Sequence, residues 1–145
     1  MKFLFVTLLY LLSWTSTSSA QQSMISLMEY MSKNNVSDVA VKSYIYKRCA
    51  SVFLYASLLS PDAKNKTISN QAQQNSELFA LLNIKHLTTN GNMSSADAKK
   101  NTYDNVERMT KAYGDDGQAN FIKIGVYISG YIQDDYNYCN RLIKE

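Results

Sequence analysis

The chain has 145 residues, of which 46% are hydrophobic and 19% charged, and its formal net charge is +3 at pH 7. A chain of this length supports one domain that buries about two-thirds of its unfolded surface, which excludes a two-domain enzyme. So small a positive excess does not indicate nucleic acid or a strongly anionic surface as a partner.

The first 20 residues are typical of a secretory signal peptide. Lys2 precedes the apolar run Phe3–Leu12, which is too short to span a membrane as a helix. Ser18 and Ala20 place small residues at the −3 and −1 positions of a bond after Ala20. We therefore expect the mature protein to be one domain, residues 21–145, that is secreted or periplasmic and has no stable membrane anchor.

The two cysteines, Cys49 and Cys139, both follow the expected cleavage site. Export places them where thiols are normally oxidised, so we expect a disulfide between them. Closing a loop of about 91 residues stabilises a fold by roughly 4–5 kcal/mol in the chain-entropy model.

Helical periodicity accounts for most of the expected mature chain. Proline and glycine are scarce, one and five in the whole chain, and they fall between periodic segments. A short helix is expected over residues 23–33. A second helix is expected to begin at a cap on Ser37 and to stop at Pro61, and its apolar residues occupy more than one side, so it should be central. A third helix is expected over residues 68–88.

The fourth helix is expected to begin at Ser94, because Asp97 three residues later resembles a capping box. It is expected to end at Tyr113, with Gly114 as the left-handed residue that follows a helix. The next three residues, Asp-Asp-Gly, are expected to turn the chain.

The last helix is expected over residues 118–144. Its predicted core face carries Phe121, Ile124, Ile128, Ile132, Cys139 and Leu142. Beside that face lies a candidate interaction stripe of three tyrosines, Tyr127, Tyr131 and Tyr138. Tyrosine combines a large apolar ring with a polar tip, so the stripe fits either a partner surface or a seam between helices.

Four substantial helices with short connections predict an all-α, four-helix-bundle-like single domain with an additional short N-terminal helix. Each cysteine lies on the apolar face of its own helix, the second or the last. A disulfide between them predicts that these two helices are neighbours.

A candidate polar pocket is expected beside the disulfide. Asp135 falls within the apolar face of the last helix, where an unpaired carboxylate would cost several kcal/mol. Arg48 and Asp135 each lie within one turn of a cysteine, so the disulfide should bring them together. Tyr44 and Tyr55 share an arc with Arg48 and could stack on its guanidinium or donate to the carboxylate. The cluster is either a structural ion pair that fixes helix register or a pocket that recognises a ligand or partner.

The sequence contains no recognisable catalytic, metal or cofactor motif. His86 is the one histidine, and no nucleophile or carboxylate accompanies it at a familiar spacing, so we expect a partly buried, hydrogen-bonded side chain. With both thiols in a disulfide, a single imidazole is too little for zinc. Asp115-Asp116-Gly117 lacks the ligand register of a calcium-binding EF-hand.

We therefore expect a small exported protein that binds a macromolecular partner without catalysis, as inhibitors, immunity proteins, chaperones and adaptors do. The partner would be a protein or another component of the cell envelope. One alternative is a small extracellular or periplasmic hydrolase that uses Glu29, Glu77 or Glu107 as its acid. Another is a carrier of a small apolar ligand. A concave cleft around one glutamate favours the hydrolase, whereas an exposed apolar and tyrosine patch favours the binding protein.

Overall fold

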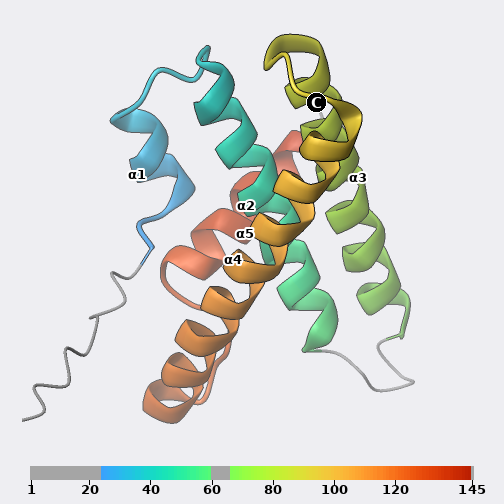
Figure 1. Ribbon diagram of the computed structural model, residues 1–145. Helices are drawn as coiled ribbons and strands as arrows, with labels where there is room; N and C mark the ends of the chain where they lie inside the picture. The colour runs from blue at the N-terminus through green and yellow to red at the C-terminus, as the bar shows by residue number, and fades with distance from the viewer. Residues whose placement is uncertain (1–23, 60–65, 145) are drawn as a thin grey trace, which may run out of the picture.

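The computed structural model describes residues 24–59 and 66–144 (Figure 1). These residues form five α-helices, and no strand occurs among them. The expected signal peptide, residues 1–20, lies outside the described residues. Within the two described ranges, no helix has the length and apolar character needed to cross a membrane.

α2 lies in the middle of the molecule and contacts the four other helices. In Figure 1, α2 and α4 run in one direction, whereas α3 and α5 run in the other. α1 packs against α5 and the first half of α2. The helices are α1 (Leu27–Ser32), α2 (Val39–Leu58), α3 (Lys66–Asn90), α4 (Ser95–Ile124) and α5 (Tyr131–Leu142).

Side-chain caps begin three of these helices. Ser94 accepts a hydrogen bond from the backbone N–H of Asp97 at 3.1 Å, as the sequence predicted for α4. Ser26 caps α1 in the same way. α2 is capped by Asp38 instead of the expected Ser37, and its Oδ1 accepts from the N–H of Ala40 at 2.7 Å. An aspartate at this position also places a negative charge at the positive end of the helix dipole.

The disulfide joins α2 to α5 at the centre of the core. Cys49 and Cys139 are bonded, with 5.4 Å between their Cα atoms, and both are completely buried. Phe53, one turn after Cys49, stacks on Phe79 of α3 at 5.9 Å and meets Tyr136 of α5 edge-on at 5.3 Å between ring centroids. The predicted disulfide and the predicted contact between these two helices are confirmed.

The predicted boundary between the last two helices is wrong. α4 does not end at Tyr113 but continues to Ile124, which gives it a length of 30 residues, so no turn forms at Gly114. The left-handed glycine is Gly125, with φ of +74°, and its N–H donates to the carbonyl of Phe121 at 2.8 Å. Helix interiors tolerate glycine at a cost of about 1 kcal/mol each, which tertiary packing can outweigh.

Gly117, within α4, packs closely against Tyr55 of α2. A Cβ at Gly117 would overlap the hydroxyl of Tyr55 on α2, so the missing side chain lets the two helices approach closely. α4 extends beyond the other helices at its C-terminal end (Figure 1). The predicted core face is therefore wrong at Phe121 and Ile124, which are 42% and 57% exposed, and correct at the buried Ile132.

Candidate functional site

A buried ion pair joins α2 and α5 beside the disulfide. Arg48 precedes Cys49 on α2, and Asp135 lies one turn before Cys139 on α5. Nη2 of Arg48 donates to Oδ2 of Asp135, and both residues are 0% exposed. The structure thus brings together the two charges that the sequence placed near the cysteines.

Asp135 accepts hydrogen bonds from three other elements of the fold. Besides Arg48, its Oδ2 accepts from the hydroxyl of Tyr113 on α4 at 2.5 Å. Its Oδ1 accepts from the backbone N–H of Leu27, at the start of α1, at 2.6 Å. One carboxylate therefore connects α5 to α1, α2 and α4.

All three guanidinium nitrogens of Arg48 donate hydrogen bonds. Nε donates to the hydroxyl of Tyr113 at 2.7 Å, and Nη1 donates to the hydroxyl of Tyr44 at 2.8 Å. Nη2 also donates to the carbonyl of Ile25 at 3.1 Å. The guanidinium carbon lies within 5.7 Å of three ring centroids, those of Tyr44, Tyr113 and Tyr131. Aromatic faces attract a cation at such distances.

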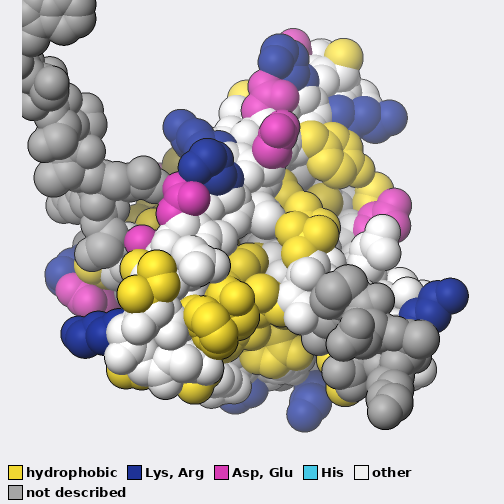
Figure 2. All heavy atoms as spheres, turned by 90° about the horizontal axis from the view of Figure 1, so that it is seen from below, with side chains coloured by type: hydrophobic (Ala, Val, Ile, Leu, Met, Phe, Trp, Pro, Cys, Tyr) yellow, Lys and Arg dark blue, Asp and Glu magenta, His cyan; other side chains and the backbone are white. Residues whose placement is uncertain are grey.

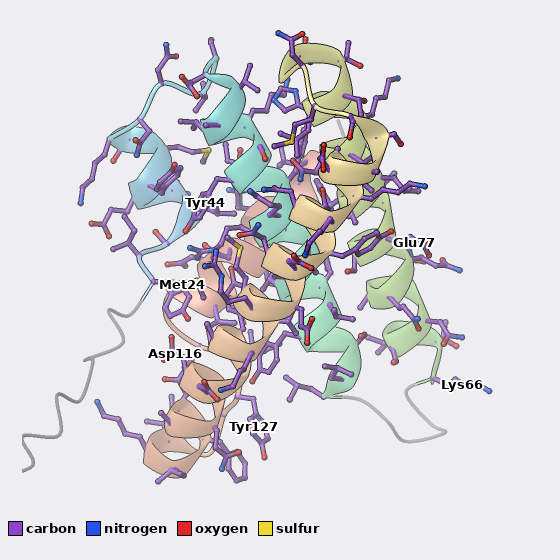
Figure 3. All side chains as sticks on the ribbon, viewed as in Figure 1. Met24, Tyr44, Lys66, Glu77, Asp116 and Tyr127 are labelled. Carbon is purple, nitrogen blue, oxygen red and sulfur yellow. A yellow bond between two sulfur atoms is a disulfide. The ribbon has the colours of Figure 1, made fainter. Side chains whose placement is uncertain are left out.

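Only one of the two tyrosines predicted for the pocket reaches Arg48. Tyr44 contacts the guanidinium and also packs on Tyr30 at 4.3 Å, so it lies between α1 and α2 (Figure 3). Tyr55 stacks on Tyr113 at 6.3 Å, and within the described residues its buried hydroxyl has no hydrogen-bond partner. The sequence did not predict Tyr113 in the pocket, and it placed Tyr131 only in the interaction stripe. The apolar periodicity of α4 indicated that Tyr113 would be buried, but not what its hydroxyl would meet.

Burial controls the ionisation of the groups around the pair. It raises the pKa of the Asp135 carboxyl, a rise that Arg48, Tyr113 and the N–H of Leu27 oppose. It also raises the pKa of the Tyr113 hydroxyl well above 10.0. Burial, followed by the hydrogen bond to Asp116, raises the pKa of Tyr131. Tyr113 and Tyr131 therefore remain protonated donors at neutral pH. Solvent reaches neither Arg48 nor Asp135, so a ligand could touch the pair only by displacing this network.

The three tyrosines of the predicted stripe do not share one helix face. Tyr127 lies between α4 and α5, at the free end of α4, and stacks on Phe121 at 4.3 Å (Figure 3). Tyr131 begins α5, and its hydroxyl donates to Asp116 at 2.5 Å. Tyr138 is further along α5 and half-buried. The stripe is divided because its first member lies outside α5.

His86 and the three glutamates occupy separate places. The half-buried His86 lies with Nε2 3.1 Å from the carbonyl of Val39. Glu29 is exposed on α1 and pairs with Lys33 at 2.6 Å, whereas Glu77 and Glu107 are exposed on α3 and α4. Among the described residues, no group of three or more His, Cys, Asp or Glu side chains could hold a metal ion.

The free end of α4 carries an exposed apolar surface, which we call the α4 tip and define as residues 118–127. Figure 2, viewed from below, shows hydrophobic side chains gathered on this end of the molecule. Its large apolar residues are Phe121, Ile122, Ile124 and Val126, which are 42%, 77%, 57% and 49% exposed. Monomeric proteins rarely expose clustered apolar residues without a functional reason.

Comparisons with protein-family models, with curated proteins and with solved structures give no match to this chain.

Proposed function

We propose that the mature chain, residues 21–145, is a small exported protein that binds a protein partner through the α4 tip and catalyses no reaction. In this proposal α2, α3, α4 and α5 form a four-helix-bundle-like scaffold, with α1 as an additional short helix. The observation that carries the proposal is the exposure of apolar side chains at an end of α4 that extends beyond the scaffold.

The chemistry of the α4 tip supports a protein partner. Phe121 stacks on Tyr127, and this aromatic pair is flanked by Ile122, the most exposed of the tip's large apolar side chains. Buried aromatic anchors commonly supply most of the binding energy at protein interfaces. Residues 117–130 contain no acidic residue, and Lys123 is their only charge. The tip therefore fits an apolar hollow with an acidic group at its rim.

The disulfide and the buried ion pair support this function indirectly. A disulfide fits the oxidising compartment expected for an exported protein. Arg48 and Asp135 serve in this proposal as a structural pair that fixes α5 against α2 and α4. A rigid scaffold lowers the entropic cost of binding through a projecting end.

The test compares tip and control variants in a capture experiment. Oxidised wild-type protein, Ile122→Glu and Leu81→Glu are immobilised and incubated with the native extracellular fraction. Leu81 is 54% exposed on α3 and serves as the matched control. A protein that wild type and Leu81→Glu retain is then produced and titrated by calorimetry. We expect Ile122→Glu to weaken its affinity about tenfold or more, a loss of about 1.4 kcal/mol or more.

Two outcomes contradict the proposal. One is equal binding of the identified protein by Ile122→Glu and wild type. The other is tip-dependent binding to lipid vesicles without any retained protein, which would make a membrane surface the partner.

The hydrolase is the second candidate, because Glu77 and Glu107 line neighbouring grooves on α3 and α4. Both grooves include Leu54, Tyr103 and Val106. Turnover of a cell-wall or other extracellular polymer that is abolished in Glu77→Gln or Glu107→Gln, but retained in Glu29→Gln, would favour this candidate over a binding protein.

A further inference from the structure

A cavity of about 480 Å³ opens at the end of the molecule opposite the α4 tip, the upper end in Figure 1. It lies where α2 begins and where the chain passes from α3 to α4. Sites for small molecules commonly have volumes of about 300–1,000 Å³. The cavity is separate from the buried ion pair and from the grooves that contain the glutamates.

Ser43 is one of the residues that line this cavity, and its hydroxyl is unpaired among the described residues. The residue is 2% exposed. The other serines of α2 behave differently, because Ser51 donates to the carbonyl of Lys47 and Ser57 to that of Leu54, each at 2.7 Å. A buried hydroxyl without a partner destabilises a fold. Its presence in the wall of an open cavity points to a polar ligand.

Opposite charges line the same cavity. Asp38 and Lys47 both contribute to its wall, and neither has a salt-bridge partner among the described residues. Lys47 is half-buried, and burial together with the charge of Arg108 lowers its pKa. Oδ1 of Asp38 caps α2, and Oδ2 remains for another donor. Nζ of Lys47 donates to Oδ1 of Asn101 at 3.4 Å, a neutral partner that leaves the charge of Lys47 unbalanced.

Amide and apolar side chains fill the wall between these charges. Asn90, Asn92 and Asn101 each carry both a donor and an acceptor, as the peptide group does. Of these groups, Nδ2 of Asn90 lies 3.1 Å from Nδ1 of His86. Leu87 and Met93 add an apolar portion that can pack against carbon atoms. This wall matches a ligand with alternating amides and small side chains.

We propose that this cavity binds a short peptide with free termini, about three residues long. Its carboxylate meets Lys47, its ammonium group meets Asp38, and Ser43 and the asparagines bond its peptide groups. The cavity volume of about 480 Å³ lies within the range of small-molecule sites and accommodates a peptide of this length. The site is independent of the α4 tip, so neither proposal depends on the other.

The test uses tri-L-alanine and its two blocked forms as probes. Oxidised, isotope-labelled protein is titrated by NMR with tri-L-alanine, with its C-terminal amide and with its N-acetyl form. We expect tri-L-alanine to shift the amide signals of residues 38–47, 90–93 and 101. Loss of either terminal charge should weaken binding about tenfold.

Variants assign each charge to its partner. Lys47→Met should bind the C-terminal amide and tri-L-alanine with equal affinity, because the partner of the carboxylate is gone. Asp38→Asn, which retains a capping side chain, should bind the N-acetyl form and tri-L-alanine with equal affinity. Ser43→Ala should weaken the binding of tri-L-alanine without lowering the unfolding temperature of the protein. Lys99→Met, an exposed charge on α4, is the control and should behave as wild type.

The proposal is overturned if tri-L-alanine leaves these signals unchanged. It is also overturned if amidation weakens binding equally in wild type and Lys47→Met, because the carboxylate then lies elsewhere. Binding of D-glucuronate with equal or greater affinity would assign the cavity to hydroxylated carboxylates and not to peptides. Circular dichroism of each variant shows whether a loss of binding reflects loss of the fold.

Discussion

The backbone N–H of Leu27 donates to the buried carboxylate of Asp135 at 2.6 Å, across 108 residues of sequence. Next to this bond, the carbonyl of Ile25 accepts from Arg48. The charged pair thus receives one backbone donor and one backbone acceptor from the segment that leads into α1. This segment completes the hydrogen bonding of two groups that would otherwise be costly to bury.

Removal of one member of the pair should destabilise the fold strongly. Asp135→Leu leaves Arg48 buried without its counter-charge, and we expect a loss of about 3–5 kcal/mol in the free energy of unfolding. The double variant Arg48→Met with Asp135→Leu should lose less, because no unpaired charge remains. Urea unfolding of the oxidised protein measures both values.

The matched control for that prediction is the exposed pair Lys100 and Asp104, 2.5 Å apart. Lys100→Ala should change the free energy of unfolding little, because surface pairs are worth about 0–1 kcal/mol. A double variant at the buried pair that is less stable than Asp135→Leu would contradict the prediction.

The two glycines within α4 should respond oppositely to alanine. Gly117→Ala should destabilise the fold, because its Cβ overlaps the Tyr55 hydroxyl, whereas nothing lies within 4 Å of a Cβ at Gly114. Gly114→Ala should therefore stabilise the helix by roughly 0.5–1 kcal/mol. Thermal unfolding compares the two variants. Tyr55→Phe should partly restore the stability of Gly117→Ala, and a destabilising Gly114→Ala would indicate that α4 is interrupted there.

The position of those glycines also shows where sequence information was sufficient and where it was not. Helical periodicity placed Arg48 and Asp135 near the cysteines, because each residue is fixed by its own helix within one turn of a sulfur. The length of α4 depended on a contact between Gly117 and Tyr55, which are far apart in sequence. Local turn signals could not reveal that contact, so the predicted helix ended at Tyr113, 11 residues before the end of α4.

Alkaline pH should unfold the protein through its buried tyrosines. Burial raises the pKa of Tyr113 well above its ordinary value of 10.0, so the unfolded chain loses this proton first as pH rises. The stability that the neutral hydroxyl contributes is present below pH 10 and is lost as pH increases beyond it. Urea unfolding between about pH 9 and 11 should show this decline.

A conservative pair of variants isolates that contribution. Tyr113→Phe should lower stability at neutral pH and make its decline above pH 10 less steep. Tyr103→Phe, at a side chain 49% exposed, should leave the decline unchanged. An equal slope in wild type and Tyr113→Phe would show that other groups cause the alkaline loss.

Reduction of the disulfide should lower stability substantially. Cys49 and Cys139 are 90 residues apart, and in the chain-entropy model such a loop contributes roughly 4–5 kcal/mol. Urea unfolding with and without a reductant measures the difference, and Cys49→Ala with Cys139→Ala provides a version that does not depend on the reductant. A loss below about 1 kcal/mol would show that non-covalent packing alone joins α2 to α5.

The expected processing site can be tested directly. Expression with the native leader in a secreting host should yield a protein whose N-terminal residue is Gln21 and whose thiols are oxidised. Intact-mass analysis reads both features at once. A product that retains residues 1–20 with reduced cysteines would remove the basis for an exported function.

Synthesis places a time constraint on α1. The ribosome adds Asp135 108 residues after Leu27, which takes roughly 5–20 s at the usual rates of elongation. Until then the N–H of Leu27 has no carboxylate to bond, so α1 cannot complete its packing before nearly all of the chain has been made. The network around Asp135 therefore closes only when synthesis of the chain is nearly complete.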